Sequence, residues 1–290
     1  MPHPTLRNWL SIGALGLIWG ATFMVIALAL RGYGPVTVAT ARTTLGAVTL
    51  CVAVVALGRP LPVWSALLGA HILVIGLFST AIPFFLLSWG QQSVASAFAG
   101  LSMAAVPLFV LPLAHVFVPG EQLNWRKMAG FLLGFLGVLV LTGPDALAGS
   151  AATLPRLACL GAALCYAVSS IATRRCPPVD PVMLAALSLI VGAGALIPAM
   201  AVSEGLPRPV GAIPMAAIIV LGLVPTALAT LIRVQVIRSA GPSFMTLTNY
   251  QVPLWSVLFG TLVLDETLSP RFFVALGLIL AGLALSRKRR

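Results

Sequence analysis

The most informative shortage in this 290-residue chain is of charged residues, which make up 8% of it against about 25% in soluble domains. Only six residues are acidic, and 60% of the chain is hydrophobic. Too little polar surface remains to face water, so the composition excludes a soluble globular protein. Long apolar blocks recur along the whole chain, which is typical of a polytopic membrane protein rather than of one with a single anchor.

The chain also lacks the cysteine spacing of a metal or redox site. The cysteines are Cys51, Cys159, Cys165 and Cys176, with no C-x-x-C pair among them. We interpret them as small core hydrophobes, and we expect neither a metal nor a cofactor. The first apolar block is too long for a signal peptide, so no cleavable leader is expected.

Cutting the chain at its charges and at its Pro/Gly clusters leaves ten apolar segments close to the length of about 20 residues that crosses a bilayer. They run approximately over 9–30, 36–57, 65–88, 94–117, 126–143, 157–173, 181–202, 211–232, 241–263 and 271–286. Every connection is short, so no soluble domain is expected.

The net charge of +11 could indicate a nucleic-acid binder, but that function needs the charges gathered on one face. Here the basic residues stand singly or in pairs between apolar blocks. If the N-terminus is cytoplasmic, the inner segments hold 12 of them (Arg7, Arg59, Arg126, Lys127, Arg174, Arg175, Arg233, Arg238 and the tail 287–290) and the outer segments hold four (Arg31, Arg156, Arg208 and Arg271). The positive-inside rule therefore predicts that both termini are cytoplasmic, and no nucleic-acid partner is expected.

An internal repeat divides the chain into two halves, 1–146 and 147–290. At a shift of 146, residues 96–108 align with 242–254 and pair Phe98 with Phe244 and Pro107 with Pro253. At a shift of 145, Glu121 meets Glu266. Five spans per half is an odd number, so the halves cross the membrane in opposite directions. The expected fold is all-α, with ten transmembrane helices in two inverted five-helix repeats around a central cavity, which is a transporter architecture.

Several motifs at matching places in the two halves resemble a known family. The segment GEQLNW (120–125) before the fifth span and DETLSP (265–270) before the tenth resemble the Glu-x-Leu signature of the EamA-type, ten-helix branch of the drug/metabolite transporter superfamily. LIWGATF (17–23) resembles the first-helix motif of that family, and Pro107 and Pro253 match its fourth and ninth helices. The resemblance covers essentially the whole chain and is greatest to the YddG-type amino-acid exporters. It implies a multi-pass protein of the bacterial inner membrane that exports amino acids or related metabolites.

Prolines well inside four spans are candidates for the substrate site, which in such folds lies near the midplane where helices are interrupted. They are Pro83, Pro107, Pro225 and Pro253, from spans three, four, eight and nine. Each removes an N–H, so a kink or local unwinding is expected there, with a packing role as the alternative.

Polar residues in span nine are further candidates: Thr246, Asn249, Tyr250 and Gln251, with Ser243 and Thr248 nearby. A buried amide is costly unless it is paired, so Asn249 and Gln251 should point into the bundle or a wet cavity. They lie about 200° apart on a helical wheel, so one could join helices while the other meets substrate. Met103 in span four would line the cavity with a flexible apolar side chain.

Trp19 in span one and Tyr166 in span six lie at middle depth, away from the interfaces where aromatic residues usually anchor a helix. Both could pack helices together or line a cavity for an apolar side chain.

Arg42 is the one formal charge well inside a predicted span, about 10 Å from its outer end. It could bind a substrate carboxylate or gate the site, or it could extend to the outer interface.

The predicted spans contain no carboxylate, which disfavours a proton-coupled exporter of cationic drugs. A lone Arg42 also disfavours a carrier of sugar phosphates, which needs several converging cations. The expected partners are therefore the lipid bilayer and a neutral or zwitterionic small molecule with an apolar part. A monomer would suffice, although a dimer is compatible. The alternatives are an antiporter or exporter of another small metabolite or drug, a channel, and an integral-membrane enzyme, for which the chain lacks clustered His, Asp or Glu.

Overall fold

A computed structural model describes residues 5–119, 124–143, 151, 153–240, 242–245 and 247–286. Every regular element in these ranges is helical, which confirms the all-α prediction for this part of the chain. The physical reason is that lipid offers no hydrogen-bond partner to the backbone, and a helix pairs its N–H and C=O groups within its own segment.

Most of the long helices are unbroken, and three segments are interrupted. The unbroken ones are α1 (Leu6–Ala29), α2 (Pro35–Ala56), α7 (Trp125–Thr142), α8 (Thr153–Arg175), α9 (Pro181–Ser203) and α14 (Pro270–Ser286). The interrupted ones are α3 (Ala66–Gly76) with the π-helical turn η1 (Leu77–Ala81) and α4 (Ile82–Gly90); α5 (Ser96–Ser102) with the 3-10 turn η2 (Met103–Ala105) and α6 (Val106–Phe117); and α10 (Ala212–Leu221) with the π-helical turn η4 (Gly222–Leu228) and α11 (Ala229–Ala240). The short α12 (Pro242–Met245) precedes α13 (Thr248–Val263).

Prolines accompany all three interruptions. Pro83 lies at the start of α4 and Pro107 at the start of α6, directly after the irregular turns, and Pro225 lies within η4. Proline has no N–H and cannot donate a helical hydrogen bond, and each irregular turn accommodates the bond that is lost. Pro253 behaves differently from our expectation, because α13 continues through it as an α-helix. Membrane helices tolerate such a proline when neighbouring groups satisfy the freed backbone, and a turn at Leu247 directly precedes α13.

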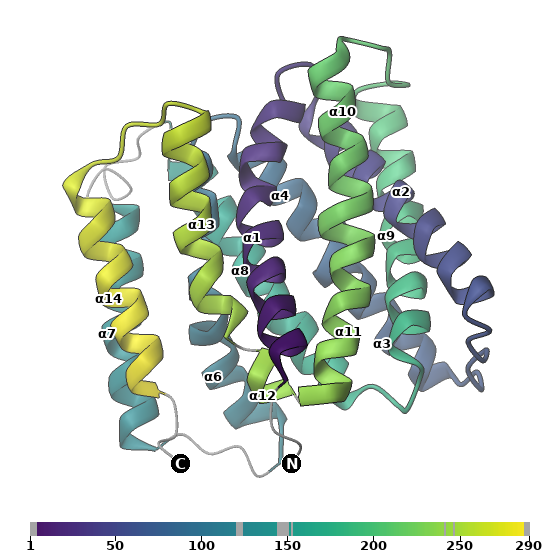
Figure 1. Cartoon of the computed structure of the whole chain (residues 1–290), viewed down its shortest axis with the longest axis horizontal. Coiled ribbons are helices and arrows are strands. Elements are labelled where there is room, and N and C mark those ends of the chain that lie inside the picture. Colours follow the sequence, from purple (N-terminus) through teal and green to yellow (C-terminus); the bar gives the residue numbers. More distant parts are fainter. Residues whose placement is uncertain are drawn as a thin grey trace.

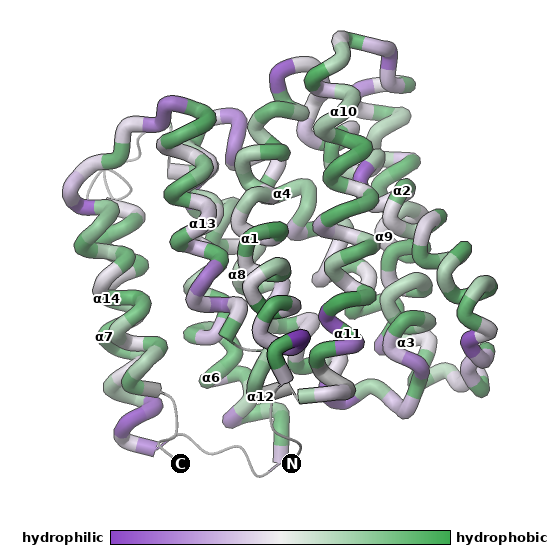
Figure 2. The backbone as a smooth tube through the Cα atoms, in the orientation of Figure 1, coloured by the Kyte–Doolittle hydropathy of each residue, from purple (hydrophilic) through white to green (hydrophobic). Residues whose placement is uncertain are grey.

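Eight helical segments of the described chain are long and apolar enough to cross a membrane. They are Leu6–Ala29, Pro35–Ala56, Ala66–Gly90, Ser96–Phe117, Trp125–Thr142, Thr153–Arg175, Pro181–Ser203 and Ala212–Val236. The two last helices are shorter, with 16 residues in α13 and 17 in α14. Figure 2 shows hydrophobic residues along the helices and hydrophilic ones mainly near their ends and in the loops. The chain is thus a polytopic membrane protein, and the count of ten spans stays a prediction.

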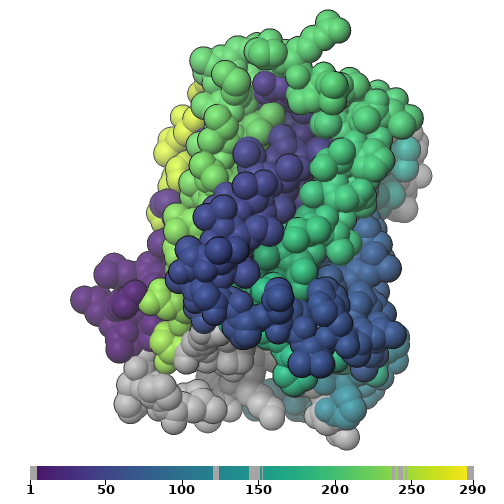
Figure 3. Space-filling model, turned by 90° about the vertical axis from the view of Figure 1, so that its right-hand side faces the viewer, coloured from purple at the N-terminus to yellow at the C-terminus, as the bar shows by residue number. Residues whose placement is uncertain are grey.

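The helices pack in pairs that join the two ends of the sequence. α7 packs along α14 at one edge of the molecule, and α1 packs along α13 and along the α10–α11 segment (Figure 1). α2 packs along α9 and against η4, and Figure 3 shows α2 crossing the face between α9 and the α10–α11 segment. α8 contacts α4 and α6. The interior is therefore built from both predicted halves.

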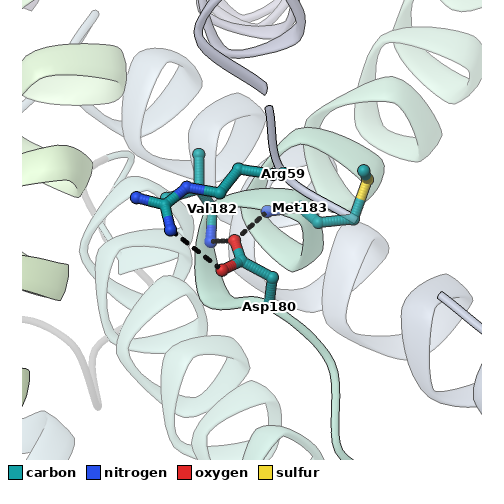
Figure 4. Close-up of polar contacts among 4 residues, drawn as sticks. All are labelled: Arg59, Asp180, Val182 and Met183. Carbon is teal, nitrogen blue, oxygen red and sulfur yellow. Dashed lines mark hydrogen bonds and ion pairs between the residues drawn. The ribbon is translucent and has the colours of Figure 1, made fainter. Parts of the chain in front are cut away.

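The helices α2 and α9 are antiparallel and are tied together at both ends. We call the side of the bundle on which α1 begins and α14 ends the terminal side (Figure 1). On the opposite side, the carboxylate of Glu204 at the end of α9 accepts hydrogen bonds from the backbone N–H groups of Val36 (2.9 Å) and Thr37 (2.8 Å) at the start of α2. On the terminal side, Arg59, which follows α2, lies 3.7 Å from Asp180 at the start of α9 (Figure 4).

The Asp180 carboxylate also caps α9, so its two roles can be separated. It accepts from the N–H groups of Val182 (2.9 Å) and Met183 (3.2 Å). Asp180→Ala should cost about 1–2 kcal/mol through the lost cap. Asp180→Asn keeps an oxygen acceptor and loses only the pairing with a partly exposed Arg59, which is worth at most about 1 kcal/mol. Thermal unfolding midpoints in detergent measure both, and an equal loss for the two variants would contradict the capping role.

Candidate functional site

The two π-helical turns carry the same motif, Gly-Leu-x-x-Thr-Ala, at 76–81 and at 222–227. The two copies are 146 residues apart, which is the shift that aligns 96–108 with 242–254. In each turn the threonine hydroxyl donates to an earlier carbonyl, from Thr80 to Gly76 (2.6 Å) and from Thr226 to Leu221 (2.8 Å). These bonds satisfy carbonyl groups in the widened turns, which are the interrupted backbone that membrane proteins place in their interior.

Each π-helical turn packs against a glycine of the opposite half. A Cβ on Gly46 of α2 would meet the methyl group of Thr226 in η4, and a Cβ on Gly192 of α9 would overlap the hydroxyl of Thr80 in η1. Gly46 and Gly192 are again 146 residues apart. The same contact is thus made twice, once with the glycine in the first half and the turn in the second, and once with these roles exchanged.

Trp19 reaches the second turn from α1. Its indole Nε1 donates to the backbone oxygen of Pro225 at 3.3 Å. The indole is half-buried and packs against two apolar clusters, one of which includes Phe23 and Phe98 and the other Ile12 and Leu15. Trp19 therefore lies where the two clusters meet at the interrupted span.

Arg42 is buried in the first half of α2 and touches the two spans that contain the π-helical turns. Only 4% of the residue is exposed. The carbon of its guanidinium lies 3.8 Å from the ring centroid of Phe84 in α4. Its Nε and Nη2 donate to the hydroxyl of Thr226 in η4 at 3.4 and 3.3 Å. The structure brings this cation between one side chain of the first half and one of the second.

Tyr166 of α8 lies in the same region. It packs against the small cluster that contains Phe84, Ala39 and Leu196, and its phenol lies within electrostatic range of Arg42. Tyr166 also packs against the large cluster around Phe98. Trp19, Arg42, Pro225 and Tyr166, which were separate candidates in the sequence, thus gather around the two π-helical turns.

The candidates from spans four and nine differ in their burial and in the residues that they contact. Met103 in η2 packs against the large cluster, while Pro107 is partly buried at the start of α6 and Pro253 is buried in α13. Thr246 lies outside the described residues. Contacts between α13 and α5 bring these two spans together.

The three consecutive candidates of α13 point in different directions. The Tyr250 hydroxyl donates to the backbone oxygen of Leu283 in α14 (3.2 Å), which is a helix-joining contact. The side chain of Gln251 lies against Gly16 of α1. Asn249 is exposed at the protein surface and does not point into the packed bundle. Of the two amides, Gln251 is the one that meets another helix.

Two residues of this region were not predicted from the sequence, Phe84 and Thr226. Phe84 looks like any core aromatic, and no local pattern singles it out. Thr226 could have been found, since the 146-residue shift extended upstream aligns it with Thr80 inside the repeated motif.

The region offers one cation, aromatic rings, hydroxyl groups and backbone oxygens. No group of three or more His, Cys, Asp or Glu that could hold a metal occurs in the described parts of the chain. The cation, the aromatic rings, the hydroxyl groups and the backbone oxygens can together bind a small polar molecule with an apolar part.

Comparison with protein families finds two matches in the chain. The model described as the EamA-like transporter family matches residues 8–143 and again residues 154–287. The two matches divide the sequence close to the boundary at 146–147 that the internal repeat predicts.

Curated proteins similar to this chain are named as transporters. An uncharacterized transporter of Archaeoglobus fulgidus is 23% identical over 286 residues, which is 98% of this chain and 100% of that protein. The uncharacterized inner membrane transporter YedA of Escherichia coli K12 is 28% identical over 275 residues, covering 94% and 88%. A probable terminal-alkyne amino-acid exporter of Streptantibioticus cattleyicolor is 30% identical over 283 residues, covering 93% and 90%.

A solved crystal structure has a similar fold. It superposes with a TM-score of 0.66 at 24% sequence identity and covers 98% of this chain and 96% of its own. At this identity the likeness concerns the fold alone.

Proposed function

Because the chain belongs to the EamA-like transporter family, whose matched relatives are named as transporters and not as enzymes, we propose that it exports amino acids and related small metabolites across a bacterial inner membrane. The substrates would be neutral, with an apolar or aromatic side chain. Transport would proceed by alternating access, in which one site opens to each side of the membrane in turn.

One observation carries the proposal. Side chains of the first matched region, Trp19 and Arg42, contact Pro225 and Thr226 in the π-helical turn of the second. A site built at the junction of two halves changes its access when the halves move against each other, as alternating access requires.

Ten spans in two inverted repeats, 1–146 and 147–290, form the proposed architecture. The two family matches support it, as do the paired contacts of Gly46 with Thr226 and of Gly192 with Thr80. Because α1 begins and α14 ends on the same side of the bundle, an even number of crossings fits (Figure 1). The excess of basic residues in the inner segments supports cytoplasmic termini. One chain contains both halves, so a monomer would suffice.

The name of the Streptantibioticus cattleyicolor relative supports amino acids as the substrate class, and the aromatic residues Trp19, Phe84 and Tyr166 support an apolar side chain. Another small metabolite or drug is the alternative, since other relatives are named only as uncharacterized transporters.

A substrate panel in proteoliposomes tests this function. Labelled phenylalanine, leucine, a sugar phosphate and a cationic dye would be offered with and without an imposed pH gradient. We expect saturable uptake of the amino acids above that of protein-free liposomes. Uptake of the sugar phosphate or the dye without uptake of either amino acid would contradict the proposal.

A further inference from the structure

Arg42 carries a positive charge into the interior without an anionic partner among the described residues. The described acidic residues are placed elsewhere: Asp180 beside Arg59, Glu204 at the start of α2, Glu266 at the start of α5 and Asp265 exposed before α14. The partner of Asp180 is Arg59, which lies 17 positions after Arg42 and beyond the end of α2. A buried charge without a counter-ion is costly, so an anionic ligand would stabilise Arg42.

The neutral partners of Arg42 compensate the charge only in part. A guanidinium has five N–H donors, and here the two recorded bonds go to a single oxygen, that of Thr226, at 3.3 and 3.4 Å. Both distances are longer than the usual range for such bonds. The guanidinium also lies over the face of the Phe84 ring and within electrostatic range of the Tyr166 phenol. A carboxylate would supply two acceptor oxygens in the planar arrangement that a guanidinium matches best.

The position of Arg42 fits a ligand site. Thr226 belongs to η4, and Phe84 lies three residues beyond η1, so the guanidinium is held between the two spans that contain the π-helical turns. A movement of η4 would free the donors that bond to Thr226. A structural arginine would more simply be tied to rigid helix.

The residue at the equivalent position in the second half limits how much negative charge the ligand can carry. Adding 146 to 42 gives Ser188, in the register that pairs Pro35 with Pro181 and Gly46 with Gly192. Ser188 is also buried, with 4% exposed, and its hydroxyl has no hydrogen-bond partner. The position equivalent to Arg42 in the second half thus holds a neutral hydroxyl and not a second cation. One cation suits one carboxylate, while a phosphate or a dicarboxylate needs several.

We propose that Arg42 is the anchor for the single carboxylate of the transported molecule, with Thr226 and Phe84 holding the guanidinium until the substrate displaces them. This inference deepens the proposed function and rests on it in one respect, namely that the ligand is transported. The substrate class is accordingly monocarboxylates with an apolar side chain, of which neutral amino acids are one group.

Three compounds with the same ring test the proposal: phenylalanine, 3-phenylpropanoate and 2-phenylethylamine. Binding to the purified full-length protein in detergent is measured by thermal stabilisation over a range of concentrations. The wild type should bind the two carboxylates at least about tenfold more tightly than the amine. Arg42→Gln should lower the affinity for both carboxylates by about tenfold to a hundredfold and leave the amine within about twofold. Arg42→Lys keeps the charge and should recover part of the carboxylate preference.

The ratio between ligands is read within one protein sample, so the amount of folded variant cancels. Equal loss of all three ligands in Arg42→Gln would overturn the proposal, because it would show a structural role. Amine binding as tight as that of the carboxylates in the wild type would overturn it even if the variant does not accumulate, and so would failure of all three to bind. Arg42-dependent binding of 3-phenylpropanoate without amino-acid transport would contradict the proposed function but would still support the binding of a carboxylate by Arg42.

Discussion

Gly20→Leu is expected to prevent the chain from reaching its folded state, because α1 and α13 approach most closely at this position. A Cβ on Gly20 would overlap the Cβ of Trp255, and it would lie 3.1 Å from the backbone oxygen of Val252 and 3.3 Å from the backbone nitrogen of Ser256. Backbone atoms of a packed helix cannot move aside singly. Small residues permit such close approach of membrane helices, and overpacking of a tight contact costs about 1–3 kcal/mol or more.

Gly13 provides a matched control on the same helix. It lies seven residues before Gly20, and a Cβ there would have nothing within 4 Å. Gly13→Leu should be neutral or slightly stabilising, since leucine is more favourable than glycine inside a helix by up to about 1 kcal/mol. The measurement is the yield of monodisperse protein in detergent together with its thermal midpoint. Wild-type yield and midpoint for Gly20→Leu would show that the two helices do not pack as described.

Glu266→Ala should give the second large effect, because its carboxylate caps a distant helix. The oxygens accept from the backbone N–H groups of Ser96 (2.6 Å) and Ala97 (3.0 Å) at the start of α5. These charge-assisted bonds are worth more than neutral ones, and their loss leaves two partly buried donors unpaired. The expected cost is about 3 kcal/mol in the free energy of unfolding.

Two further variants separate the cap from the local charge. Glu266→Gln keeps one oxygen acceptor and should fall between wild type and Glu266→Ala. Asp265→Asn removes the neighbouring charge at a position with a φ of 54°, which asparagine tolerates, and it should change little. If Asp265→Asn lowers the thermal midpoint as much as Glu266→Ala does, the lower midpoint is caused by a general charge effect and not by the loss of the cap.

The sequence was sufficient for the helices, and three of the four prolines at which an interruption was expected accompany one. Apolar runs of membrane length can only be helical in lipid, and a proline inside such a run removes one bond of the ladder. Pro83, Pro107 and Pro225 accompany irregular turns, whereas α13 continues through Pro253. The difference depends on whether neighbouring groups satisfy the freed backbone, which single-sequence patterns do not contain.

Contacts between distant segments were harder to predict. The sequence marks Arg42 as a charge within a span, but its partner Thr226 lies 184 residues away and belongs to a turn whose widening is a local detail. The sequence marks Glu266 only as part of a repeated motif, and no pattern singles out Glu204. Their caps on α2 and α5 depend on which helix starts lie beside them in the fold.

Counterflow tests the central claim of alternating access most directly. Proteoliposomes containing the full chain would be preloaded with unlabelled phenylalanine or with buffer, and the uptake of labelled phenylalanine would be followed. A carrier returns its site faster when it is loaded, so preloading should accelerate the initial uptake and produce a transient accumulation of label. Equal initial rates with and without preloading would contradict a site that opens to each side in turn.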